Sequence, residues 1–144
     1  MKMNPYLKPF CHYREPDGSI MDMAKNDLSS IPNKKGAYII VSRKNAFVYP
    51  KSTSPVIYIG TSSDLKRRMM QHMKAVLEIQ SQPLKKRNEL LWYSRYQYIV
   101  ANGADVYWFT TRGLQKHKDL EKQLIYAFYD EYLAIPVGNN ALSY

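Results

Sequence analysis

The stretch "VIYIGTSSDLKRRMMQH" (56–72) places concentrated positive charge directly after an apolar run and a glycine. In a helix that starts after the serines, Arg68 and His72 are four residues apart and share one side. Both fall at the rim of the apolar face. A guanidinium matches phosphate oxygens, and an imidazole can bind or move a proton near neutral pH. Lys66 and Arg67 point elsewhere and suit a phosphate-facing or merely soluble surface, and simple packing at the rim is the alternative for His72.

The last predicted helix carries an acidic residue where a core residue is expected. On a helical wheel that starts at Leu120, Glu121 falls at about 100°, in the middle of the apolar arc. A carboxylate there must be paired, protonated or bound to a cation, because an unpaired buried charge costs several kcal/mol. An ordinary first-turn glutamate is the alternative, and Glu131 is a more exposed candidate. An arginine, a histidine and an inward glutamate together suggest a site for a phosphate and a metal.

Composition is compatible with nucleic-acid binding but does not require it. Lys and Arg outnumber Asp and Glu by 21 to 12, and thirteen tyrosines could stack on bases. A solvated basic surface on another kind of protein is the alternative. No apolar run is long enough for a membrane span, and no secretory signal is evident. With Cys11 as the one cysteine, we expect a thiol in a reducing compartment and a cytoplasmic protein.

Periodicity and turn signals predict the elements that would position these residues. Strands are expected over 36–43, 56–60 and 105–111. Helices are expected over 86–101 and 115–133, and from a cap at Ser62 or Ser63, with Asp64 in the first turn, to about Ile79. Residues 1–35, interrupted by prolines, are expected to be irregular with a short helix over 20–28. The prediction is an α+β protein with a small three-stranded, mostly antiparallel sheet flanked by helices. The order is β-β-α-α-β-α, and the connection 44–55 forms a long turn.

These motifs resemble the GIY-YIG nuclease family. "GAY" (36–38) and "YIG" (58–60) are similar to the two short strand motifs of that family. Its arginine lies eight residues after the second glycine, which is Arg68 here. The histidine one turn later, found in the restriction-enzyme and structure-specific branches, matches His72.

The resemblance continues toward the C-terminus. Glu121 precedes an apolar pair in "EKQLI", as the metal-binding glutamate of the family does. Pro136 is followed three residues later by Asn139, which matches a family asparagine, and the neighbouring Asn140 is the alternative. The resemblance covers roughly residues 36–140, so the expected organisation is an extension over 1–35 and a nuclease-like domain over 36–144. The wide separation of Tyr38 and Tyr58 implies an enlarged hairpin loop.

What the resemblance implies is a metal-dependent endonuclease that hydrolyses phosphodiester bonds in DNA with one Mg²⁺ (or Mn²⁺). Tyr58 or Tyr38 would be the general base. Arg68 would hold the non-bridging phosphate oxygens, and His72 would orient the water or relay a proton. Glu121 would hold the metal, because hard cations prefer carboxylate oxygen.

Partners follow from the same resemblance. Lys66, Arg67 and Asn139 would contact the nucleic acid, which is duplex or branched DNA. The small size suits a free-standing nuclease, either monomeric or a homodimer. Two alternatives stay open: a non-catalytic nucleic-acid-binding module of the same fold, and a structural or ribonucleoprotein component, for which the charge of +9 would suffice.

Overall fold

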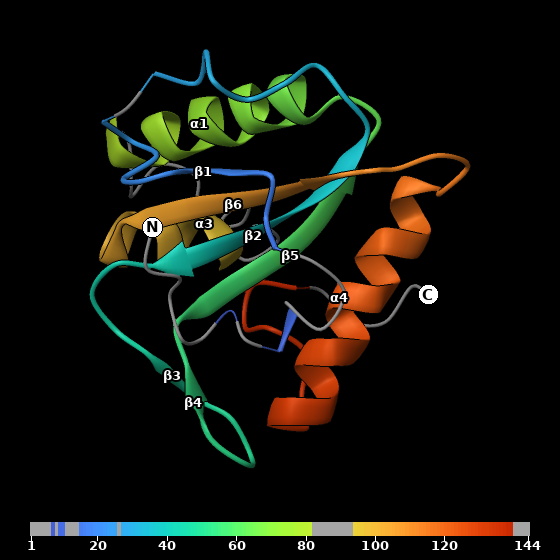
Figure 1. Ribbon diagram of the computed structural model, residues 1–144. Helices are drawn as coiled ribbons and strands as arrows, with labels where there is room; N and C mark the ends of the chain where they lie inside the picture. The colour runs from blue at the N-terminus through green and yellow to red at the C-terminus, as the bar shows by residue number, and fades with distance from the viewer. Residues whose placement is uncertain (1–6, 8, 11–14, 26, 82–93, 140–144) are drawn as a thin grey trace.

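The computed structural model describes residues 7, 9–10, 15–25, 27–81 and 94–139. They form an antiparallel four-stranded sheet between two layers of helices (Figure 1). Its strands, in spatial order, are β1 (Gly18–Ile20), β6 (Ala104–Thr110), β2 (Gly36–Ser42) and β5 (Val56–Ser62). One face carries α1 (Leu65–Ser81) and α3 (Ser94–Asn102), and the other carries α4 (His117–Tyr132).

The α+β class is confirmed, but the prediction of a three-stranded sheet is wrong. A fourth strand, β1, comes from the lead-in and pairs antiparallel with β6, with Gly18 opposite Trp108. The described residues 20–25 and 27–28 do not form the short helix that was expected there, because Ile20 belongs to β1 and bends and turns occupy 21–25. Setting aside β1 and a small hairpin between β2 and β5, the element order agrees with the predicted one.

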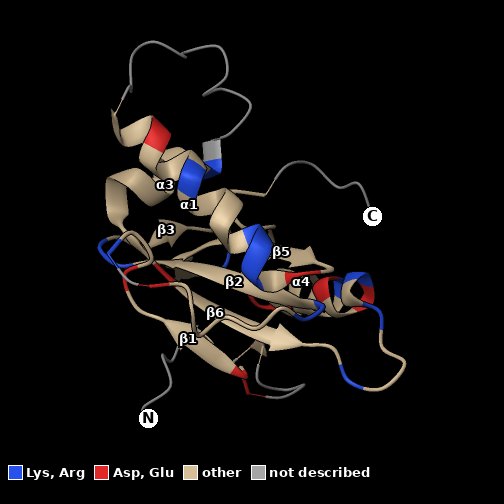
Figure 2. Cartoon of the chain, turned by 90° about the horizontal axis from the view of Figure 1, so that it is seen from above, with Lys and Arg blue, Asp and Glu red and all other residues tan. Residues whose placement is uncertain are grey.

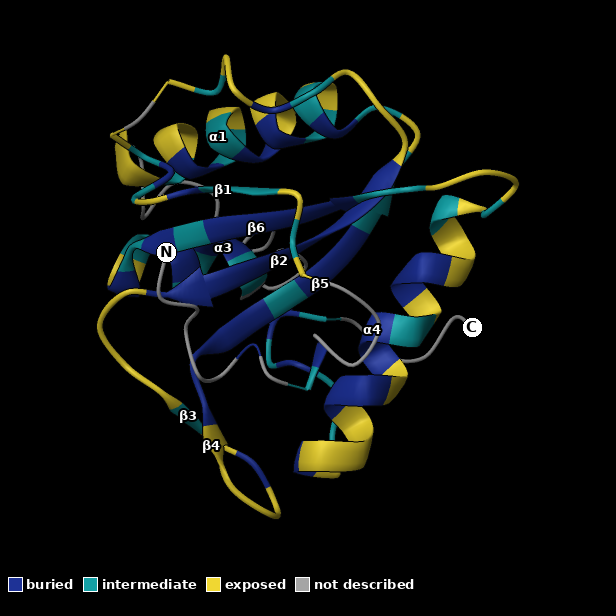
Figure 3. Ribbon diagram, in the orientation of Figure 1, coloured by how far each residue is buried: buried dark blue, intermediate teal, exposed yellow. Residues whose placement is uncertain are grey.

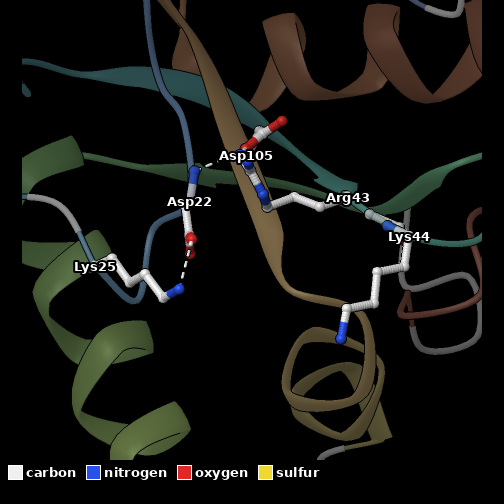
Figure 4. A network of polar contacts seen from close by, with 6 residues as sticks. Asp22, Lys25, Arg43, Lys44 and Asp105 are labelled. Atoms are coloured by element: carbon white, nitrogen blue, oxygen red, sulfur yellow. Dashed lines mark hydrogen bonds and ion pairs between the residues drawn. The ribbon is translucent and has the colours of Figure 1, made fainter.

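Polar contacts tie this lead-in to the sheet (Figure 4). The Asp105 carboxylate, at the start of β6, accepts a hydrogen bond of 2.7 Å from the backbone N–H of Asp22. The same carboxylate pairs with Arg43, which follows β2. Asp22 also lies 3.9 Å from the Lys25 ammonium. One carboxylate therefore connects the lead-in, β2 and β6.

The side chains of β2 divide the core into two halves. All seven residues of β2 are buried (Figure 3). Because successive strand residues point to opposite faces, Ala37 and Ile39 pack in the cluster with α4. Tyr38 and Ile40 pack in the other cluster, with α1 and α3. Each candidate residue on a strand is thus assigned to a face by its register.

The connection between β2 and β5 is an enlarged loop, as expected, with its own hairpin of β3 (Phe47–Val48) and β4 (Thr53–Ser54). Tyr49 anchors it. Its hydroxyl donates to the carbonyl of Val56 at 3.1 Å and accepts from the N–H of Val137 at 2.9 Å. The loop is therefore bound to the start of β5 and to the C-terminal segment.

The helices lie close to their predicted bounds, although residues 86–93 of the second predicted helix fall outside the described residues. The cap of α1 differs from the expected serine. Asp64 accepts from the N–H of Arg67 at 3.3 Å, and Ser62 accepts from the N–H of Asp64 at 3.0 Å. Within the described ranges, no helix combines the length and apolar character that crossing a membrane requires.

Candidate active site

The two tyrosine motifs meet on one face of the sheet. Tyr38 lies directly opposite Gly60 in the β2–β5 pair, and Tyr58 is its diagonal neighbour. The two rings lie 5.9 Å apart between centroids. A Cβ at position 60 would collide with both rings. Glycine at this position is therefore required by the close approach of the Tyr38 ring, which explains the pairing of the "GAY" and "YIG" motifs physically.

His72 lies deeper than the helical wheel predicted. Its side chain is 0% exposed, because α3 packs against α1 and covers that flank. His72 Nε2 lies 2.6 Å from the Tyr38 hydroxyl, and Nδ1 lies 2.8 Å from the hydroxyl of Tyr96 on α3. The expectation of a rim histidine is wrong, and both ring nitrogens are occupied by tyrosines.

Burial keeps the side chains of His72 and Tyr38 neutral. The pKa of His72 is lowered to about 3 by burial and then by the charges of Arg68 and Arg95. The pKa of Tyr38 is raised well above its usual value by burial and by Tyr58, which outweigh the lowering effect of Arg68. A neighbouring cation therefore does not make Tyr38 a phenolate at neutral pH.

The lowered pKa of His72 predicts a loss of stability in mild acid. An unfolded histidine binds a proton near pH 6.5, whereas the folded one stays neutral until about pH 3. As the pH falls through this window, the unfolded state gains protons and the free energy of unfolding decreases, by about 1.4 kcal/mol per pH unit from this group. Denaturant unfolding of the natural chain and of His72→Gln across the window measures the difference in slope. Identical slopes would contradict the burial of a neutral His72.

Two arginines flank the partly exposed Tyr58. The Arg95 guanidinium lies 4.2 Å from the centroid of the Tyr58 ring, a cation–π distance. Burial lowers the pKa of Arg68, but its interactions with the hydroxyls of Tyr38, Tyr58 and Tyr96 raise the pKa by more, so the net shift is upward. Arg68 also donates to Gln71 at 3.1 Å. The tyrosine cluster therefore carries two fixed positive charges.

Exposure separates the roles of the two tyrosines. Tyr38 is 0% exposed, whereas Tyr58 is partly exposed. A general base must contact the water that it activates. Tyr58 is therefore the better placed of the two, and Tyr38 belongs to the supporting hydrogen-bond chain behind it.

Glu121 comes from the opposite layer. It is buried, as its helical position predicted, while Glu131 is exposed. Its helix α4 packs on the Ala37 and Ile39 face of the sheet, whereas Arg68 and His72 lie on α1, across the sheet. The structure thus groups Tyr38, Tyr58, Arg68 and His72 and sets Glu121 on the other side of β5.

The helices α1 and α4, which belong to opposite layers, nevertheless begin near the same end of β5. α1 begins three residues after β5 ends, and the Thr61 hydroxyl lies 2.8 Å from Nδ1 of His117, the first residue of α4. Figures 1 and 2 both show the two helices starting at this end of the sheet. Arg68 and Glu121 each lie about one turn into their helices. A phosphate that touches both would therefore sit at this end of β5.

Asn139 binds the protein's own backbone. Its side-chain amide donates to the carbonyl of Ile59 at 2.9 Å and accepts from the N–H of Ile59 at 3.0 Å. The N–H of Gly138 donates to the carbonyl of Ile57 at 2.7 Å. Asn139 thus satisfies the outer edge of β5 beside Tyr58 and Gly60, in the way that another strand would. The alternative, Asn140, lies outside the described residues.

Asn139→Ala is expected to lower the free energy of unfolding by about 1–3 kcal/mol, because two backbone groups of Ile59 lose their partners. Asn33→Ala is the matched control, since the Asn33 amide makes an exposed hydrogen bond to Asp64, and little change is expected there. Denaturant unfolding of both variants measures the difference. Equal stabilities would contradict a structural role for the Asn139 amide.

The predicted nucleic-acid contacts Lys66 and Arg67 lie away from the tyrosine cluster. Arg67 is exposed and Lys66 partly exposed. Each borders a shallow surface groove that also includes Met70 and Lys74. This outer surface of α1 is basic, as the sequence indicated.

Metal-ligating residues are sparse. In the part of the chain that the structure describes, no three His, Cys, Asp or Glu side chains gather closely enough to hold an ion. Glu121 is a hard oxygen donor of the kind that Mg²⁺ accepts, and water and substrate oxygens commonly complete such a shell. The donor set therefore fits a one-carboxylate site but not a cage made by the protein alone.

No protein-family model, curated protein or solved structure gives a significant match to the chain. The function must therefore be argued from the geometry of these residues.

Sequence reasoning missed two members of the cluster, Arg95 and Tyr96. Both lie in "SRYQY" (94–98), which was expected to be helical but carried no functional assignment. The spacing could have predicted that Tyr96 is buried, because Tyr96 lies three residues before the apolar Ile99, on the same helix face. Because a buried tyrosine hydroxyl needs a hydrogen-bond partner, Tyr96 pointed to a polar group in the core.

Proposed function

We propose that the protein is a metal-dependent endonuclease that hydrolyses phosphodiester bonds in DNA. The observation that supports this most is the cluster of Tyr38, Tyr58, Arg68 and His72, joined by Arg95, beside the edge strand β5. Two arginines beside a partly exposed phenol provide what attack on a phosphodiester needs: charge neutralisation next to a group that can take a proton from water. Arginines that served only the stability of the fold would not need a partly exposed tyrosine hydroxyl beside them.

Each residue has a defined part in this proposal. Tyr58 is the general base, with the Arg95 guanidinium over its ring and Arg68 on the neighbouring helix α1. Arg68 also binds the non-bridging oxygens of the scissile phosphate. His72, being neutral and buried, orients Tyr38 rather than carrying a proton to solvent.

The metal belongs to Glu121 in this proposal. A bound Mg²⁺ or Mn²⁺ would supply Lewis-acid stabilisation of charge on the phosphate. Glu121 would hold it from α4 while Arg68 grips the same phosphate from α1. This places the scissile phosphate at the end of β5 where both helices begin.

Duplex or branched DNA is the proposed partner. The net charge of +9 and the basic outer surface of α1, including Lys66 and Arg67, favour a polyanion. The proposed place of action is the cytoplasm, and either a monomer or a homodimer is compatible with the proposal. The enclosure of Asn139 against Ile59 argues for a supporting role of this residue rather than direct contact with DNA.

A second candidate is a nucleic-acid-binding module of the same fold without catalysis. One observation favours it: Glu121 and Arg68 lie in opposite layers of the sheet. In that case the arginines bind phosphate, and Glu121 serves only the packing of α4.

Incubation of the purified protein with supercoiled plasmid and with branched DNA separates the candidates. The nuclease proposal predicts nicking or cutting with Mg²⁺ or Mn²⁺, none with EDTA, and none by Tyr58→Phe. Tyr126→Phe is the matched control, since this tyrosine is exposed on α4. Tight DNA binding without cleavage under all metal conditions would refute the nuclease and favour the binding module.

A further inference from the structure

The β3–β4 hairpin projects from the sheet at the start of β5 and is held firmly to the rest of the molecule (Figure 1). A hydrogen bond of 2.9 Å from the N–H of Tyr49 to the carbonyl of Ser52 closes its turn. On one side of the sheet, the Phe47 ring meets Tyr98 of α3 edge-on, 5.3 Å apart between centroids. On the other side, the Tyr49 ring meets Phe128 of α4 at 5.1 Å. The hairpin is therefore a preformed element that two helices hold in place.

The outward face of the hairpin is open to solvent (Figure 3). Val48 is 84% exposed, and Thr53, its partner across the two strands, is exposed as well. Because successive strand residues point to opposite faces, these side chains point away from the face on which Phe47 and Tyr49 pack. Lys51 is exposed in the turn between the two strands. A rigid ribbon thus presents one cation and two short side chains to solvent.

The charge of this region has one sign. The chain has no Asp or Glu from residue 28 to residue 63, whereas it has lysines or an arginine at positions 34, 35, 43, 44 and 51. Arg43 pairs with Asp105, but Lys44 and Lys51 lie exposed at the base and in the turn of the hairpin. A positive surface of this kind attracts a polyanion, and a two-stranded ribbon fits the major groove of duplex DNA.

The hairpin also lies in line with the proposed site along β5, which is an edge strand of the sheet. The hairpin precedes Val56, the first residue of β5, and the first turn of α1, with Lys66 and Arg67, follows the end of the strand. A strand of seven residues spans about 20 Å, which corresponds to about six base pairs along a duplex. A duplex that follows this edge would therefore meet exposed cations at both ends of β5, with the partly exposed Tyr58 between them.

We infer that the β3–β4 hairpin is a second DNA-contacting element, in which Lys51 pairs with a backbone phosphate and the face with Val48 lies against the duplex. The contact falls roughly six base pairs or more from the scissile phosphate, because the two lie at opposite ends of β5. This inference rests on the proposed DNA partner and extends it to a region outside the tyrosine cluster. It does not depend on cleavage.

Fluorescence anisotropy of labelled duplex DNA with the full chain in EDTA, over a salt titration, measures this contact. Lys51→Ala is expected to weaken binding roughly 3- to 10-fold at about 0.1 M salt, and to reduce the slope of log K against log salt by about 1. Lys51→Arg keeps the cation and should bind like the natural chain. Val48→Glu should weaken binding at least as much as Lys51→Ala, because its carboxylate would face the phosphates.

Lys25→Ala is the matched control. Lys25 is exposed next to the Asp22 carboxylate, and it follows β1, which forms the opposite edge of the sheet from β5. Its removal should leave the affinity and the salt slope unchanged. Because Val48 and Lys51 are exposed as well, all of these variants should fold, and denaturant unfolding checks this.

An affinity and a slope for Lys51→Ala equal to those of Lys25→Ala would overturn the inference and leave the nuclease proposal standing. A normal affinity of Val48→Glu, or a loss in Lys51→Arg as large as in Lys51→Ala, would overturn it too. Absence of DNA binding by the natural chain would overturn both the DNA partner and the role of the hairpin. Binding that depends on Lys51, in a protein that cuts no DNA with Mg²⁺ or Mn²⁺, would refute the nuclease but support the hairpin contact.

Discussion

Glu121→Gln is expected to abolish Mg²⁺-dependent cleavage, by more than roughly 100-fold, and to leave DNA binding near that of the natural chain. The substitution keeps the size of a buried side chain and one oxygen, so α4 should still pack on the sheet. It removes the negative charge that attracts a hard divalent cation. The loss should therefore appear in the metal-dependent step rather than in affinity for DNA.

The measurement combines single-turnover cleavage of plasmid over a Mg²⁺ titration with fluorescence anisotropy of labelled DNA in EDTA. Glu131→Gln is the matched control, because Glu131 is an exposed acid on the same helix, and it should cut normally. Cleavage by Glu121→Gln equal to that of Glu131→Gln would remove Glu121 from the site. The proposed nuclease activity would then need another metal ligand or none.

Arg68→Lys is expected to reduce cleavage by roughly 100-fold or more, with a smaller effect on DNA affinity. Lysine keeps the positive charge but lacks the planar fork that binds two phosphate oxygens at once. It also loses the geometry that lets Arg68 contact both Gln71 and the Tyr38 region. The deficit should therefore be concentrated in kcat, where charge develops on the phosphate.

Single-turnover rates at saturating DNA test this expectation. Arg112→Lys makes the same chemical change at an exposed residue that pairs with Asp17, and it should leave the rate unchanged. Rates for Arg68→Lys that match those of Arg112→Lys would show that only charge at position 68 matters. The proposed grip on the phosphate would then be wrong.

The residues of the tyrosine cluster differ in how far local sequence predicts them. The pairing of Tyr38 with Tyr58 follows from two adjacent strands joined in a hairpin, and the shared side of Arg68 and His72 follows from helical spacing. The burial of Glu121 followed from its place in the apolar arc of α4. The complete burial of His72 did not, because it requires α3 to cover the flank of α1.

Sequence by itself determined the α+β class, the order of the main strands and helices, the basic character of the chain and the inward direction of Glu121. These features depend on periodicities within single segments, which neighbouring residues set. Tertiary structure alone decided the fourth strand, the Tyr38–His72–Tyr96 chain, the binding of Asn139 to Ile59 and the placement of Glu121 and Arg68 in opposite layers. Each of these depends on contacts between segments far apart in the chain, where short strands and single polar side chains find partners that no local pattern specifies.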